Sequence, residues 1–197
     1  MEPIRKITLP DQSEFRLFQD EFPVDPRSND GNLCEFIFWL NEYSGYTVGD
    51  DHGFENPAEL KDTITDNDYI FPVRAYIHGG IALSLGNSYP FNCQWDSGYI
   101  GYAVIRADKV AEFGLKPIDA KKTYENAENE LAVYNSYLSG DTYGYSIVEF
   151  KTCDCCGNVE ETVTDSWWGF YGQDFHNNGL SDQIPNEFKN LILDGIK

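Results

Sequence analysis

The sequence predicts an α+β fold with a mainly antiparallel sheet, one long helix, two or three short helices and an irregular N-terminal arm. Three observations support this fold class. Several short segments mix β-branched and aromatic residues, one long segment repeats apolar residues at spacings of three and four, and strands do not alternate regularly with helices. No repeat or linker interrupts the chain, so a single domain over residues 1–197 is expected.

Three ranges make up this expected domain. Residues 1–32 carry turn and breaker signals and form the arm. Residues 33–172 form the core, and residues 173–197 form a C-terminal loop with a short helix over 186–193.

The core is expected to begin with C-E-F-I-F-W-L, a continuous aromatic segment typical of a strand buried on both faces. A loop follows this segment. A short helix is predicted from Asn56 to Ile64, because Asn56 suits the cap position and Pro57 suits the first helical position.

Three strand-like segments occupy the centre of the chain, at residues 69–78, 81–85 and 99–106. Three consecutive strands indicate an antiparallel meander. Because Pro72 has no N–H to donate, the first strand is expected to be interrupted there or to lie at a sheet edge.

Two helices and a hairpin are predicted next. A short helix ends at Gly114, and a long one runs from Asp119 to Ser139, where Gly140 ends it. The apolar stripe of the long helix is Ala120, Tyr124, Ala127, Leu131, Tyr134 and Leu138. Two later strands flank a cysteine-bearing turn and form the hairpin.

The charge of the chain excludes some classes of function. The 33 acidic and 14 basic residues leave a net charge of −19, which opposes binding to nucleic acid or to anionic membranes. The segment from Asp11 to Asp68 alone has fifteen acidic and three basic residues, a net of −12. This segment is either a solvated face or a surface that occupies a basic, nucleic-acid-binding partner.

Targeting signals are absent from the sequence. No apolar run reaches the roughly 18 to 20 residues that span a bilayer, and the N-terminus lacks a signal-peptide pattern. We therefore expect a cytoplasmic protein, with its five cysteines reduced.

Cys153, Cys155 and Cys156 lie together in T-C-D-C-C-G-N, where C-x-x-C-G has the spacing of one zinc knuckle. One knuckle supplies two of the four ligands of a structural zinc, and no second pair is visible in the sequence. We expect no cofactor, with zinc at these cysteines as the weaker alternative.

His78, Cys93, Asp96 and Asp165 are the candidates for a small enzyme or ligand-binding pocket. A nucleophilic thiol needs a base and a carboxylate that orients the base, and two carboxylates can share acid–base work. The alternatives are a buried, satisfied histidine and two structural turns, at Asp96 and at Asp165. The P-loop, G-x-G-x-x-G, H-E-x-x-H and G-x-S-x-G motifs are absent, so an enzyme is not favoured.

Five motifs in order give the chain a family resemblance. They are D-P-R-S-N-D-G-N, Y-I-H-G-G-I-A-L-S, F-N-C-Q-W-D-S-G-Y-I-G, Y-N-S-Y-L-S-G-D-T-Y-G-Y and D-S-W-W-G-F-Y-G. The chain resembles a family of small bacteriophage and mobile-element proteins with W-D-S-G-x-x-G and W-G-F-Y-G motifs. It departs from the family at Gln94, Gly79 and Trp167, where proline, serine and cysteine are frequent.

The resemblance implies a phage or plasmid accessory gene expressed in a bacterial cytoplasm, and it implies no chemistry. Acidic proteins in that setting often block host defence nucleases. We therefore predict a non-enzymatic inhibitor of a host defence nuclease complex, of the anti-CRISPR or antirestriction kind. It would bind the nucleic-acid-binding surface of its target. A protein that mimics DNA or RNA is one version of this hypothesis. The predicted partner-binding acids are Asp50, Asp51, Glu55, Glu59, Asp62, Asp66 and Asp68.

Overall fold

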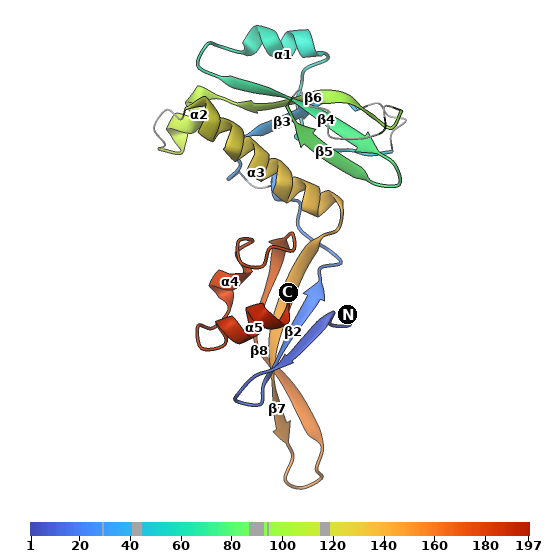
Figure 1. Cartoon of the computed structure of the whole chain (residues 1–197), viewed down its shortest axis with the longest axis vertical. Coiled ribbons are helices and arrows are strands. Elements are labelled where there is room, and N and C mark those ends of the chain that lie inside the picture. The colour runs from blue at the N-terminus through green and yellow to red at the C-terminus, as the bar shows by residue number, and fades with distance from the viewer. Residues whose placement is uncertain (29, 41–44, 87–92, 94, 115–118) are drawn as a thin grey trace. The chain divides into compact units, whose positions relative to one another are not determined.

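The computed structural model describes residues 1–28, 30–40, 45–86, 93, 95–114 and 119–197. They form two compact units, residues 25–139 and residues 1–24 with 140–197, and each unit holds one four-stranded antiparallel sheet (Figure 1). The predicted α+β class is confirmed. The range expected to form one core is instead divided between the two units. Of the family-like motifs, Asn29, Phe91, Asn92 and Gln94 lie outside the described residues.

The sheet of residues 25–139 is not the predicted meander. Its strands are β3 (Glu35–Phe38), β4 (Tyr69–Ile77), β5 (Ile81–Leu85) and β6 (Ser97–Ile105), in the order β3-β6-β4-β5. The chain turns back from β4 into β5 and then returns on the other side of β4 as β6. The strands themselves were predicted correctly, but the order of strands was wrong.

Pro72 lies inside β4, which is neither interrupted there nor an edge strand. Its carbonyl accepts a hydrogen bond from the N–H of Gly86 at 2.7 Å, just beyond the last β4–β5 pair, Val73 with Leu85. In an antiparallel ladder the N–H and C=O of one residue point to the same side. The missing N–H of Pro72 therefore faces the end of the β5 ladder, and Pro72 still pairs with Tyr102 of β6. The register of β4 and β6 shifts one residue later, between Val73 and Arg74.

Two helices cover opposite faces of this sheet (Figure 1). The long helix α3 (Ala120–Leu138) buries Ala127, Leu131 and Tyr134 of the predicted stripe, and Thr123 with them. The short helix α1 (Pro57–Thr63) buries Leu60 against the other face. The remaining helices of the unit are η1 (Pro26–Ser28) and α2 (Ala107–Glu112).

Side-chain caps fix the starts of α1 and α3 where the sequence predicts them. The side chain of Asn56 accepts hydrogen bonds from the N–H groups of Ala58 and Glu59, and that of Asp119 accepts one from Lys122. The caps explain why these two boundaries were predictable.

The prediction of an irregular N-terminal arm is wrong, because residues 1–24 supply two strands. The second sheet has the order β1-β2-β7-β8, formed by β1 (Arg5–Thr8), β2 (Glu14–Gln19), β7 (Thr142–Thr152) and β8 (Val159–Tyr171). Phe15 and Leu17 of β2 alternate with polar residues and are fully buried. Turn signals on both sides of β2 concealed this short alternation.

Two short helices, α4 (Leu180–Gln183) and α5 (Lys189–Gly195), pack on the second sheet through Leu180, Ile192 and Leu193. The sequence predicts no α4 and starts the terminal helix at 186 rather than 189. The β7–β8 hairpin is confirmed. Because β2 pairs with β7 only as far as Val148, the end of the hairpin projects as a two-stranded ribbon (Figure 1).

A Gly101→Ala substitution is expected to destabilise residues 25–139 by about 3 kcal/mol, because the added Cβ would overpack a backbone contact. That Cβ would lie 2.1 Å from the carbonyl oxygen of Ile37, which cannot move without disturbing β3. Chemical unfolding measures the loss. Gly98→Ala is the matched control in the same strand, since its Cβ would meet nothing within 4 Å. Equal stabilities of the two variants would contradict the prediction.

Candidate functional site

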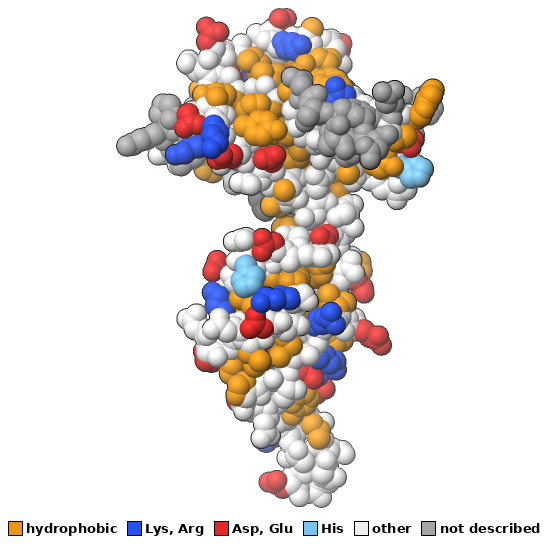
Figure 2. Space-filling model, viewed as in Figure 1, with side chains coloured by type: hydrophobic (Ala, Val, Ile, Leu, Met, Phe, Trp, Pro, Cys, Tyr) orange, Lys and Arg blue, Asp and Glu red, His pale blue; other side chains and the backbone are white. Residues whose placement is uncertain are grey.

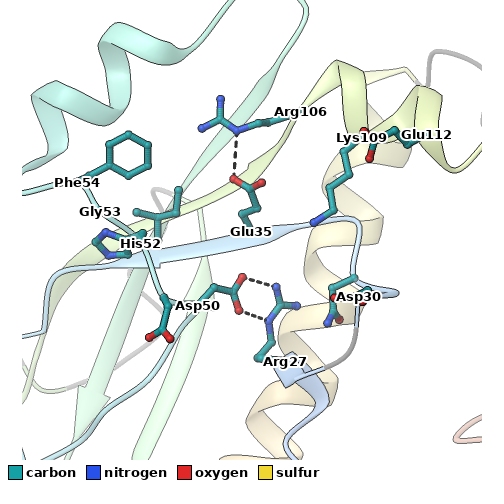
Figure 3. Close-up of a pocket in the computed structure, with 13 residues that line it drawn as sticks. Arg27, Asp30, Glu35, Asp50, His52, Gly53, Phe54, Arg106, Lys109 and Glu112 are labelled. Atoms are coloured by element: carbon teal, nitrogen blue, oxygen red, sulfur yellow. Dashed lines mark hydrogen bonds and ion pairs between the residues drawn. The ribbon is translucent and has the colours of Figure 1, made fainter.

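A polar pocket of about 650 Å³ lies in the unit of residues 25–139, between β3, the loop at residues 50–54 and α2 (Figure 3). Its ionisable lining residues are Arg27, Asp30, Glu35, Asp50, Asp51, His52, Arg106, Lys109 and Glu112. Carboxylates outnumber guanidinium and ammonium groups by five to three. The pocket therefore has acidic character, like the chain as a whole.

The guanidinium of Arg27 binds groups of its own chain and is not available to a ligand. Its guanidinium makes two hydrogen bonds to the carboxylate of Asp50, at 2.9 and 2.6 Å (Figure 3). It makes a third to the carboxylate of Glu130, at 2.9 Å. It also donates to the carbonyl of Cys34 at 2.5 Å and lies 4.1 Å from the centre of the Phe36 ring. Burial opposes its charge, but the two carboxylates outweigh burial and raise the pKa of Arg27.

The same two carboxylates also hold the backbone around β3. Asp50 accepts a hydrogen bond from the N–H of Phe36 at 2.8 Å, and Glu130 accepts one from the N–H of Leu33 at 2.9 Å. Asp50 was predicted as a partner-binding acid, and the structure gives it this structural role. Arg27 was not predicted as a site residue, although it is one of only three cations from Asp11 to Asp68.

Two other predicted acids stabilise local structure. Glu59 accepts hydrogen bonds from the N–H of Glu55 at 2.8 Å and from the side chain of Asn56 at 3.1 Å. Asp68 accepts from the N–H of Ala107 at 2.9 Å and from Thr65. Arg106, the cap residue of α2, makes no side-chain capping bond, so Asp68 supplies it from a distant loop.

The remaining four predicted acids face solvent. They are Asp51, Glu55, Asp62 and Asp66. Among the residues that the structure describes, their carboxylates make no hydrogen bond and no ion pair. Asp51 also lines the pocket. These four carboxylates are therefore available to a partner, which sets them apart from Asp50, Glu59 and Asp68.

His52 is partly buried at the side of the pocket. Its Nε2 lies 2.9 Å from the carbonyl oxygen of Phe38, and its ring meets Trp39 edge-on at 5.3 Å. Its buried Nδ1 has no hydrogen-bond partner among the described residues. No motif in the sequence singles out His52.

The structure brings three of the four alternative pocket residues together. The carboxylate of Asp96 lies 3.1 Å from Nδ1 of His78 and accepts a hydrogen bond from the thiol of Cys93 at 3.3 Å. Asp96 therefore lies between the thiol and the imidazole. A nucleophilic cysteine needs the base on its own sulfur, and this order does not provide it. The side chain of His78 is 70% exposed, so the expected buried histidine is wrong.

Asp165 belongs to the other unit. Its carboxylate accepts a hydrogen bond from the hydroxyl of Tyr145 at 2.9 Å. Burial is the larger cause of the raised pKa of Tyr145, and this hydrogen bond is the next. Several aromatic residues follow Asp165 along β8. Phe170 is buried, whereas Trp167 is 49% and Trp168 is 44% exposed.

The three cysteines of the β7–β8 turn have their sulfurs within 4.8 Å of one another, a grouping that could bind a metal ion. Cys153 and Cys155 are closest, with their sulfurs 2.9 Å apart. Hydrogen bonds from the thiol of Cys155 and from the backbone N–H groups of Cys155 and Cys156 lower the pKa of Cys153 to about 6. Cys34 is buried elsewhere, and burial raises its pKa.

No protein-family model, curated protein or solved structure matches the chain. The resemblance to phage accessory proteins therefore stays a prediction. Among the described residues, the helices are too short or too polar to cross a bilayer.

An Arg27→Met substitution is expected to destabilise the protein by about 3 kcal/mol, because it leaves two half-buried carboxylates without their cation. Methionine retains an apolar stem against Phe36, so the loss reports mainly on the ion pairs. Lys109→Met is the matched control, since Lys109 lines the same pocket and forms no ion pair with any described residue. A control variant that unfolds as easily as Arg27→Met would contradict this account.

The contribution of Asp68 to stability is expected to depend on pH. Partial burial favours its neutral form, but hydrogen bonds from Ala107 and Thr65 outweigh burial and hold its pKa below the usual value. The stabilisation is therefore present above the unfolded-state pKa of about 3.9 and is lost as the pH falls through the lower, folded-state pKa. The difference in unfolding free energy between the wild type and Asp68→Asn should shrink below about pH 4. A constant difference down to about pH 3 would refute this role.

Proposed function

We propose that the protein is a non-enzymatic inhibitor that occupies the basic, nucleic-acid-binding surface of a host defence nuclease complex, of the anti-CRISPR or antirestriction kind. Carboxylates on a folded scaffold would compete with nucleic-acid phosphates for Lys and Arg side chains of the target. This mechanism needs acids that are exposed and not already neutralised.

The acidic excess belongs to both units. Residues 25–139 carry 18 acidic and 8 basic residues, and the other unit carries 15 and 6. On the face shown in Figure 2, acidic side chains lie among basic and apolar ones on both units. Charge alone therefore does not identify a binding surface. The exposure of each carboxylate, and whether it already has a hydrogen-bond or ion-pair partner, must identify it.

The observation that carries the proposal is the group of exposed acids at residues 51–66. Four carboxylates in this segment have no partner among the described residues, as set out above. Lys61 is the cation within the segment, and its ammonium lies 5.4 Å from the centre of the Tyr102 ring. We name Asp51, Glu55, Asp62 and Asp66 the exposed acid group.

A second candidate function is a small catalytic or ligand-binding site at His78, Cys93 and Asp96. The two contacts of Asp96 favour it, because they bring together three residue types that carry chemistry. The position of the carboxylate between the other two groups favours a structural role instead. A Cys93→Ser variant distinguishes the two functions, since the exposed acid group does not involve this thiol.

The proposal is tested by DNA cleavage with a Cas9–guide RNA complex and with a type I restriction endonuclease, each mixed with excess protein at low salt. Neutralising the exposed acid group (Asp51→Asn, Glu55→Gln, Asp62→Asn and Asp66→Asn together) should weaken inhibition about 10- to 100-fold, because four exposed ion pairs are lost. Inhibition by the wild type should also fall steeply between about 50 and 200 mM salt.

A matched control removes the same number of charges from the other unit, through Glu2→Gln, Glu21→Gln, Glu149→Gln and Glu160→Gln, all of them exposed. This control should inhibit like the wild type. Equal loss in both variants would show that only net charge matters. Unchanged cleavage by every nuclease with excess wild-type protein would reject the proposal for these targets, and loss of inhibition on Cys93→Ser would favour the second candidate.

A further inference from the structure

The turn between β7 and β8 carries three cysteines whose side chains take no part in the hydrophobic core of the described residues. Cys153 is half-buried, Cys155 and Cys156 are exposed, and none of the three belongs to a hydrophobic cluster of the described residues. They lie at the tip of the projecting ribbon, where β7 and β8 pair only with each other. The exposed acid group lies in the other unit, so the turn needs an explanation of its own.

Backbone hydrogen bonds shape this turn so that the sulfurs converge. The N–H of Cys153 donates to the carbonyl of Asn158 at 2.7 Å, and the N–H of Gly157 donates to the carbonyl of Cys153 at 2.8 Å. Gly157 has a φ of +73°, which favours glycine. The tight turn thus places three thiols from four consecutive residues within 4.8 Å of one another.

This spacing suits a metal ion. Zinc–sulfur bonds are about 2.3 Å long, so the sulfurs of a tetrahedral zinc site lie roughly 3.8 Å apart. The sulfurs in the turn are already within 4.8 Å, and small side-chain rotations would bring them to that separation. Because thiolates are soft ligands, they favour zinc and similar thiophilic ions over magnesium or calcium.

We propose that Cys153, Cys155 and Cys156 form a three-thiolate site for Zn²⁺, with its fourth coordination position open to water or to a ligand from outside the turn. No fourth histidine, cysteine, aspartate or glutamate joins the cluster among the described residues. Zinc sites with three protein ligands hold water or another molecule in the fourth position, whereas structural sites use four protein ligands. The sequence pattern suggested one pair of a knuckle, and the geometry supplies Cys155 as a third ligand.

The test is a titration of the full-length, reduced and metal-free protein with Co²⁺, a coloured substitute for Zn²⁺, under anaerobic conditions. One equivalent of Co²⁺ should produce a sulfur-to-cobalt charge-transfer band and intense visible bands of tetrahedral coordination, and Zn²⁺ should displace it. Cys153→Ser, Cys155→Ser and Cys156→Ser should each reduce the charge-transfer intensity by about one third and weaken Zn²⁺ binding at least about tenfold.

Cys93→Ser is the matched control and should bind Co²⁺ like the wild type, because Cys93 lies outside the cluster. Circular dichroism should show that all four variants fold. A thiol count of five confirms that the starting protein is fully reduced. Fully reduced protein that gives no charge-transfer band would overturn the proposal, as would a band that survives Cys155→Ser unchanged.

Discussion

The contact of Arg27 with Asp50 and Glu130 is the interaction on which the unit of residues 25–139 depends. It joins three parts of the chain that are distant in sequence: η1, the loop after β3 and the helix α3. Asp50 also accepts a backbone N–H from Phe36 in β3, and Glu130 accepts one from Leu33 just before this strand. One buried cation thereby fixes the edge strand of the sheet against the long helix. Apolar packing alone would leave the register of this short strand poorly defined.

This arrangement separates acids that serve the fold from acids that can serve a partner. Asp50, Glu59 and Asp68 have their oxygens directed at N–H groups of their own chain. A carboxylate used in this way has little left to offer a target surface. The composition of the segment does not distinguish the two kinds of acid, because the difference lies in which backbone donors each side chain reaches.

The features that the sequence predicted correctly are those set by residues close together in the chain. The cap at Asn56 and the α3 stripe from Tyr124 to Leu138 act within one or two turns of helix, and the structure confirms them, whereas Ala120 of the predicted stripe is exposed. The strand order, the two units and the burial of Arg27 depend on contacts between distant residues. Periodicity within a segment carries no information about such contacts. The strand β2 was missed for a local reason, because turn signals on both sides concealed the alternation of Phe15 and Leu17.

Asp96 is another acid whose backbone and side chain both serve contacts within its own chain. Its backbone carbonyl accepts a hydrogen bond from the N–H of Ile77 at 2.7 Å and so extends the pairing of β4 with β6. Its side chain holds the thiol of Cys93 and the imidazole of His78 on either side. A carboxylate in that central position orients both groups but keeps the imidazole from acting on the thiol directly. For the imidazole to accept the thiol proton directly, the side chain of Asp96 would first have to rotate away, which would break both contacts that define the cluster.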